Sequence, residues 1–188
     1  MKNVIIIHGT EGYPEENWFP WLKIELEKIG YKVSVPGFPS PPIIPAKISE
    51  WWKVINNYTI DESTAIIGHS LGGVFTLRIL EKLDKPIASA FFIGTPIGEK
   101  PIANYDRDVA FSGFEFDWNK IISSAKHFEV FQSDNDPYVG LENGRTLAEK
   151  LGVKLNFIPN AGHFDTQAGY TKFEELLSLI LLNEKENL

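Results

Sequence analysis

Residues 63–73 read Ser-Thr-Ala-Ile-Ile-Gly-His-Ser-Leu-Gly-Gly, and this stretch decides the fold. A short apolar run leads into a Gly-x-Ser-x-Gly turn centred on Ser70, and a helix-like pattern follows. This is the pattern of a nucleophile elbow, a sharp strand-to-helix turn that exposes a serine hydroxyl. Gly68 and Gly72 flank the serine, where a Cβ would clash as the strand and the helix pack closely. The alternative is a glycine-rich turn whose serine only caps the helix.

The composition limits the class of protein. The chain has 188 residues, of which 43% are hydrophobic, so we expect one globular domain over residues 1–188. The net charge is -7 and the basic residues form no cluster, which argues against nucleic acid or a membrane surface as a partner. The absence of cysteine excludes disulfides and thiolate nucleophiles, and with no secretory signal in the sequence we expect a cytoplasmic protein.

Strand-like and helix-like patterns alternate along the whole chain. The expected strands cover residues 4–7, 31–35, 65–67, 87–93, 127–131 and 153–158. The apolar residues between them recur at spacings of three and four, apart from a proline-rich loop at 36–42 and an aperiodic stretch at 97–120. This alternation predicts an α/β fold with about six mostly parallel strands and helices on both faces. The strands of such a sheet end at one edge, where ligands bind.

A serine hydroxyl needs a base within hydrogen-bond reach and a third group that orients the base. In α/β hydrolases these partners follow in the order Ser, Asp or Glu, His, each in a loop after a later strand. Here an acidic loop, residues 134–137, follows the expected fifth strand, and His163 follows the sixth. We expect His163 to be the base and Asp136 to orient it, with Asp134 as the rival because it lies in the same loop. We expect Asp106 and Asp108 to be solvated charges.

An acyl-transfer site also needs donors for the oxyanion. The backbone N–H groups of Leu71, after the nucleophile, and of Thr10, in the loop after the first strand, are the candidates.

The aromatic stretch 97–120 could be plain core, but its position is suited to a small cap over a pocket. The four aromatic residues that we consider as pocket residues are Trp18, Phe111, Phe114 and Trp118. For Trp18 we favour the interpretation that it is a core residue. The four histidines lack ligand spacing, so we expect no metal site.

Four stretches carry a resemblance that spans nearly the whole chain. They are Ile66-Ile67-Gly68-His69-Ser70, Trp118-Asn119-Lys120-Ile121, Ser133-Asp134-Asn135-Asp136-Pro137 and Gly162-His163-Phe164. In these the chain resembles the small α/β-hydrolase-superfamily serine hydrolases typified by retinoblastoma-binding protein nine. The resemblance implies a compact hydrolase fold, a catalytic triad on Ser70, Asp136 and His163, and no cofactor.

The resemblance and the residues lead to one main hypothesis and two alternatives. The main one is a serine hydrolase that cleaves small esters or amides through an acyl-enzyme on Ser70. The first alternative is a protein-binding module on a hydrolase scaffold, although an intact triad argues against it. The second is an acyltransferase, which would use the same residues and differ only in what accepts the acyl group.

Overall fold

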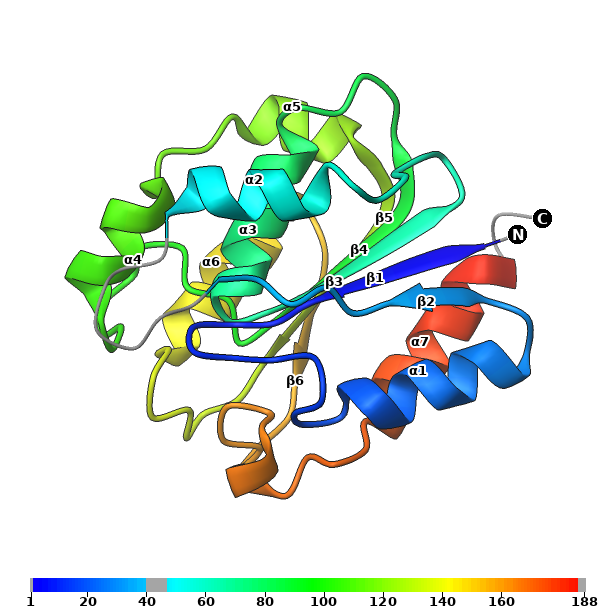
Figure 1. Ribbon diagram of the computed structural model, residues 1–188. Helices are drawn as coiled ribbons and strands as arrows, with labels where there is room; N and C mark the ends of the chain where they lie inside the picture. The colour runs from blue at the N-terminus through cyan, green and yellow to red at the C-terminus, as the bar shows by residue number, and fades with distance from the viewer. Residues whose placement is uncertain (1, 40–46, 186–188) are drawn as a thin grey trace.

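The computed structural model describes residues 2–39 and 47–185, and its centre is a six-stranded sheet (Figure 1). The strands are β1 (Asn3–Ile7), β2 (Lys32–Ser34), β3 (Thr64–His69), β4 (Ile87–Ile93), β5 (Ala125–Gln132) and β6 (Leu155–Phe157). Their order is β2-β1-β3-β4-β5-β6, and every pairing is parallel. The predicted α/β fold is therefore confirmed, and all strands end at one edge.

Helices cover both faces of the sheet. They are α1 (Phe19–Lys28), α2 (Ile48–Ile55), α3 (Leu71–Leu80), α4 (Tyr105–Ser112), α5 (Trp118–Ser123), α6 (Leu141–Leu151) and α7 (Glu174–Lys185), with a short 3-10 helix at Thr166–Ala168. Figure 1 shows α1 and α7 on one face and α2, α3, α5 and α6 on the other. The predicted two-sided arrangement follows from strands that are apolar on both faces.

Strand β1 shows how one strand serves two cores. Its Ile5 and Ile7 side chains pack into the core under α2, α3 and α6, whereas Val4 and Ile6 pack against α1 and α7. Successive side chains of a strand point to opposite faces, so the continuous apolar run is required by the two helix layers. The tightly packed sheet forms a rigid base for the loops at its carboxyl edge.

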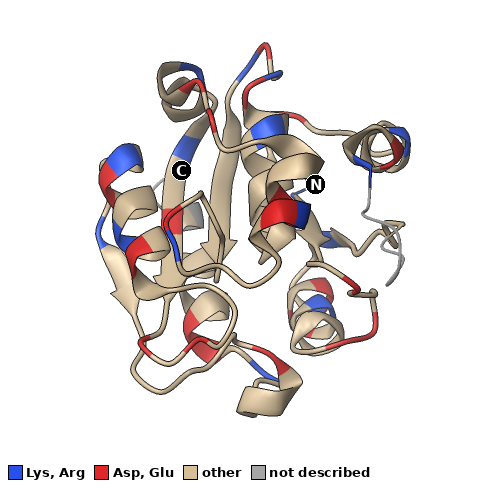
Figure 2. Cartoon of the chain, turned by 90° about the vertical axis from the view of Figure 1, so that its left-hand side faces the viewer, with Lys and Arg blue, Asp and Glu red and all other residues tan. Residues whose placement is uncertain are grey.

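Two of the expected irregular stretches need comment. The segment 97–120, which shows no clear period, contains α4 and the start of α5. The proline-rich loop predicted at 36–42 is described only as far as residue 39, and its remaining part lies outside the described residues. None of the helices in the described ranges is long and apolar enough to cross a membrane. Figure 2, which looks onto the edge where the strands end, shows the Lys and Arg residues spread over several elements.

Candidate active site

Ser70 lies at the turn between β3 and α3 in a strained backbone conformation. Its φ is 54° and its ψ is -124°, a backbone conformation that residues other than glycine rarely adopt. The Ser70 N–H donates a hydrogen bond of 2.8 Å to the carbonyl of Ile93, which ties the turn to β4. Although Ser70 occupies the N-cap position of α3, its side chain makes no capping hydrogen bond. The turn therefore presents the hydroxyl, and the reading of Ser70 as a simple cap does not fit.

The glycines around Ser70 are required by close backbone approach. A Cβ at Gly68 would lie 2.5 Å from the Gly73 Cα, and a Cβ at Gly72 would lie 2.2 Å from the Ile7 carbonyl oxygen. Real Cβ atoms are essentially never this close to backbone atoms. Only glycine at these positions lets β3, α3 and the end of β1 pack together and form the elbow.

His163 and Asp136 are joined by a hydrogen bond at the same edge. The distance between His163 Nδ1 and Asp136 Oδ2 is 2.7 Å, and both side chains are buried. The other Asp136 oxygen accepts hydrogen bonds from the backbone N–H groups of Tyr138 and Val139, at 2.8 and 3.0 Å. Because Nδ1 faces a carboxylate, Nε2 is the ring nitrogen left for a proton transfer.

The rival carboxylate, Asp134, has another partner. Its Oδ1 accepts a hydrogen bond of 2.8 Å from the backbone N–H of Asn160, so it braces the loop before His163. Of the two candidates, Asp136 is the one that meets the histidine.

Ser70 and His163 line one pocket, but no hydrogen bond joins the Ser70 hydroxyl to the His163 ring within the described residues. Such bonds are often long in the free enzyme and shorten when substrate binds.

The two other histidines near the elbow are held in neutral forms. The His8 Nδ1–H donates to the carbonyl of Gly9 at 2.9 Å, and His8 Nε2 accepts from the N–H of Phe38, also at 2.9 Å. The His69 Nε2–H donates to the carbonyl of His163 at 2.8 Å, and burial lowers the pKa of His69 to about 3. His69 thus anchors the backbone of His163, a role that the sequence pattern did not indicate.

Comparisons with known proteins show the family of this chain. The sequence model of the serine hydrolase family matches residues 4–181. The chain belongs to the serine hydrolase family. The hydrolase is 31% identical to YdeN of Bacillus subtilis over 172 residues, which cover 90% of each chain. It is 26% identical to the serine hydrolase RBBP9 of Rattus norvegicus over 180 residues, 94% of this chain and 92% of the relative.

Solved structures extend the comparison to the fold. The crystal structure of the Bacillus subtilis ydeN gene product superposes with a TM-score of 0.90 at 28% identity, covering 98% of the hydrolase and 100% of that chain. Est1E of Butyrivibrio proteoclasticus superposes with a TM-score of 0.71 at 17% identity, over 98% of this chain and 88% of that one, which shows likeness in fold alone. The resemblance stated from the sequence is therefore confirmed.

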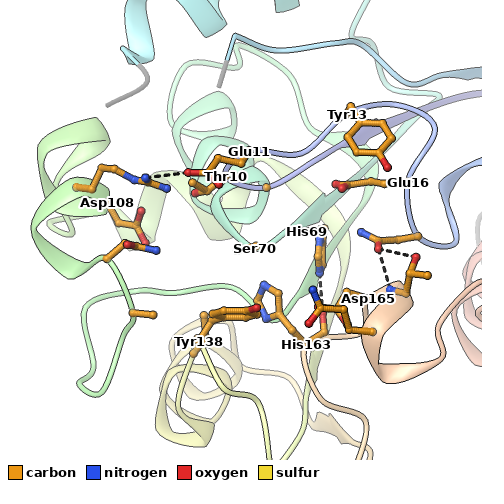
Figure 3. Close-up of a pocket in the computed structure, with 18 residues that line it drawn as sticks. Thr10, Glu11, Tyr13, Glu16, His69, Ser70, Asp108, Tyr138, His163 and Asp165 are labelled. Carbon is orange, nitrogen blue, oxygen red and sulfur yellow. Dashed lines mark hydrogen bonds and ion pairs between the residues drawn. The ribbon is translucent and has the colours of Figure 1, made fainter. Parts of the chain in front are cut away.

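A pocket of about 570 Å³ opens in front of Ser70 and His163 (Figure 3). Its wall consists of Gly9, Thr10, Glu11, Tyr13, Glu16, Asn17, His69, Ser70, Ala103, Asn104, Arg107, Asp108, Tyr138, Val139, His163, Asp165, Thr166 and Gln167. Thr10, in the loop after β1, lies on this wall. Leu71 is the first residue of α3, so its N–H has no partner within the helix.

The aromatic residues considered for the pocket lie elsewhere. Trp18 is fully buried in the core, where its Nε1–H donates to a backbone carbonyl. Phe111 is buried in the core above the sheet, and Phe114 and Trp118 pack against the same core. From the segment that contains three of them, residues 103, 104, 107 and 108 face the pocket instead. The part of the pocket wall that α4 contributes is polar, because the apolar face of α4 packs against the core.

Carboxylates dominate the charge of the pocket wall. Four of its side chains are acidic, namely Glu11, Glu16, Asp108 and Asp165, and one, Arg107, is basic. Arg107 Nη1 lies 3.1 Å from Glu11 Oε1 and so pairs with one of them. Burial raises the pKa of Glu16, and the Asp165 carboxylate adds to that rise.

The expectation that Asp108 is a solvated charge is wrong. The residue is only 6% exposed. Burial raises the pKa of Asp108 to about 6, although the neighbouring Arg107 acts in the opposite direction. Across the described residues, no group of three or more histidine and carboxylate side chains is arranged to hold a metal ion.

Proposed function

We propose that this hydrolase cleaves small carboxylic esters or amides through an acyl-enzyme on Ser70. The observation that carries the proposal is the hydrogen bond of 2.7 Å between His163 and Asp136, in a pocket that also presents Ser70 at a strained elbow. A binding surface has no physical need for an oriented base beside an exposed hydroxyl. The pocket volume of about 570 Å³ suits a small substrate.

In the first half of the reaction, Ser70 Oγ attacks the carbonyl carbon of the substrate. His163 Nε2 takes the hydroxyl proton, and the Asp136 carboxylate stabilises the imidazolium that results. The negative oxygen of the tetrahedral intermediate accepts hydrogen bonds from the N–H groups of Leu71 and Thr10. Leu71 contributes additionally through its place at the positive end of the α3 dipole.

In the second half, the imidazolium returns its proton to the leaving alcohol or amine, and the carbon–oxygen or carbon–nitrogen bond breaks. A water molecule then attacks the acyl-enzyme, again with His163 as the base. Its attack releases the acid and restores the Ser70 hydroxyl. The tight anchoring of the His163 backbone by His69 keeps the ring in place through both halves.

The test is the removal of the Ser70 oxygen. Ser70→Ala should lower kcat on p-nitrophenyl butyrate on the order of a millionfold, because members of such a triad act as a unit. Ser123→Ala, at an exposed serine on α5, is the matched control and should retain the parent rate. A fluorophosphonate probe should label the parent and not the Ser70→Ala variant. An unreactive parent, or full activity without the Ser70 hydroxyl, would contradict the proposal and favour a binding role.

A further inference from the structure

Asp108 is a buried carboxyl group that the reaction described above does not use. It is 6% exposed, it lies on the pocket wall, and its Oδ1 has no hydrogen-bond partner. A buried carboxylate oxygen without a hydrogen-bond partner is costly, and buried polar groups in proteins are nearly always satisfied. A partner that arrives with the substrate would explain why this carboxyl group is kept at the pocket.

Neither the neighbouring arginine nor the helix dipole explains why this group is buried. The neighbouring cation, Arg107, directs its Nη1 to Glu11 at 3.1 Å. A carboxylate in the first turn of α4 interacts favourably with the helix dipole, but the exposed Asp106 in the same turn already provides this. The dipole effect does not require burial, so the placement of Asp108 is better explained by what the pocket holds.

The charge of the pocket indicates which chemistry would satisfy Asp108. Four carboxyl side chains and one arginine line the wall, and the arginine is paired with Glu11. The remaining excess is negative, which favours a positively charged guest. In Figure 3, Ser70 lies between Asp108 on one side and Glu16 and Asp165 on the other. A group that reaches Asp108 can therefore belong to the molecule whose carbonyl carbon lies at Ser70.

Resting on the proposed function, we propose that Asp108 is a specificity-determining residue whose carboxylate binds a protonated amine of the substrate. The hydrolase would then prefer esters or amides that carry an ammonium group over neutral ones of the same shape. An ammonium N–H donates a hydrogen bond to the Asp108 carboxylate, and its positive charge offsets the buried negative charge. Burial raises the pKa of Asp108 to about 6, so the group is ionised in an assay at pH 8.

The experiment compares esters that differ only in charge. 2-(Dimethylamino)ethyl butyrate, which is protonated at pH 8, is paired with its neutral isostere 3-methylbutyl butyrate. A second pair places the amine, or the matching alkyl group, in the acyl part. Acid release is followed in a pH-stat, and the measured quantity is the ratio of kcat/KM for the charged and the neutral ester. The two pairs together show on which side of the scissile bond the amine is recognised.

We expect the parent to prefer the charged ester of at least one pair by about tenfold or more, the range of a hydrogen bond to a charged group. Asp108→Asn keeps the shape and should lower this ratio by about 10- to 100-fold. Asp106→Asn removes the same charge from the exposed side of α4 and should leave the ratio as in the parent.

Four results would overturn the inference. Equal ratios in the parent and Asp108→Asn, or a parent that prefers the neutral esters, would remove Asp108 from substrate selection while the proposed hydrolysis stands. An equal fall in Asp106→Asn would show that only the overall charge matters. If the parent cleaves neither ester of either pair, the proposed function fails and the inference falls with it.

Discussion

Replacement of Asp108 by asparagine should stabilise the folded protein, and the gain should depend on pH. Burial raises the pKa of Asp108 from 3.8 to about 6 in the folded state. The folded protein therefore binds this proton more tightly than the unfolded chain does. Stability that is present at low pH is lost as the pH rises between these two values, and the full penalty persists above about 6. Asparagine cannot ionise and avoids the penalty.

The size of the effect follows from the shift. At 1.36 kcal/mol per pKa unit, the upper bound of the penalty is about 3 kcal/mol, and water in the open pocket reduces it to about 2 kcal/mol. The variant also loses a favourable charge in the first turn of α4, which costs about 0.3–1 kcal/mol. The net expectation is a gain of about 1 kcal/mol at pH 7.5, or about 2–4 °C in Tm for a domain of this size.

The assay is urea unfolding of the parent, Asp108→Asn and Asp106→Asn at several pH values from 7.5 to 4.5. The advantage of Asp108→Asn should stay level from pH 7.5 to about 6 and shrink at lower pH, whereas the exposed Asp106→Asn should show no such advantage at any pH. An Asp108→Asn protein that is less stable than the parent at pH 7.5 would refute the reasoning. So would an advantage that stays constant down to pH 4.5, because it could not come from the proton on Asp108.

Two further predictions test the close packing around the nucleophile. Gly9→Ala places a Cβ 2.7 Å from the Ser70 Cβ, so the loop after β1 must move, and we expect kcat to fall about 100-fold with little change in Tm. An unchanged kcat would show that this loop does not take part in catalysis. Gly72→Ala places a Cβ 2.2 Å from the Ile7 carbonyl oxygen and should lower the free energy of unfolding in urea by about 3 kcal/mol. Gly37→Ala is the control, because its Cβ would meet nothing closer than 3.6 Å, and it should change the free energy of unfolding by less than about 0.5 kcal/mol. Equal stability of these two variants would contradict the account of the elbow.

Much of the site could be predicted because its signals are local or topological. The elbow around Ser70 depends on neighbouring residues in the chain. The loops that carry Asp136 and His163 come to one edge because each follows a parallel strand, and the structure places them there with a hydrogen bond of 2.7 Å. Their catalytic roles stay predictions until the activity is measured, as do the single domain with a small cap and the cytoplasmic location.

The pocket wall could not be predicted in the same way. Phe111 and Asp108 lie on one short helix, and the sequence suggested that the aromatic side chain faces the substrate and the acid faces water. In the structure both side chains are buried, Phe111 in the core and Asp108 at the pocket. Their surroundings depend on how α4 is rotated over the sheet, which is decided by packing between segments far apart in the chain.

By itself, the order of residues determined the alternating strands and helices, the sharp turn at Ser70 and the edge at which the loops gather. These features follow from the periodicity of apolar side chains and from backbone sterics, which act over a few residues. Only the tertiary structure decided that the Asp134 carboxylate binds the backbone of Asn160, that His69 anchors the His163 backbone, and that a buried carboxyl group lies in the pocket. Each of these depends on atoms brought together from distant segments to within hydrogen-bond range, and no short-range pattern records such distances.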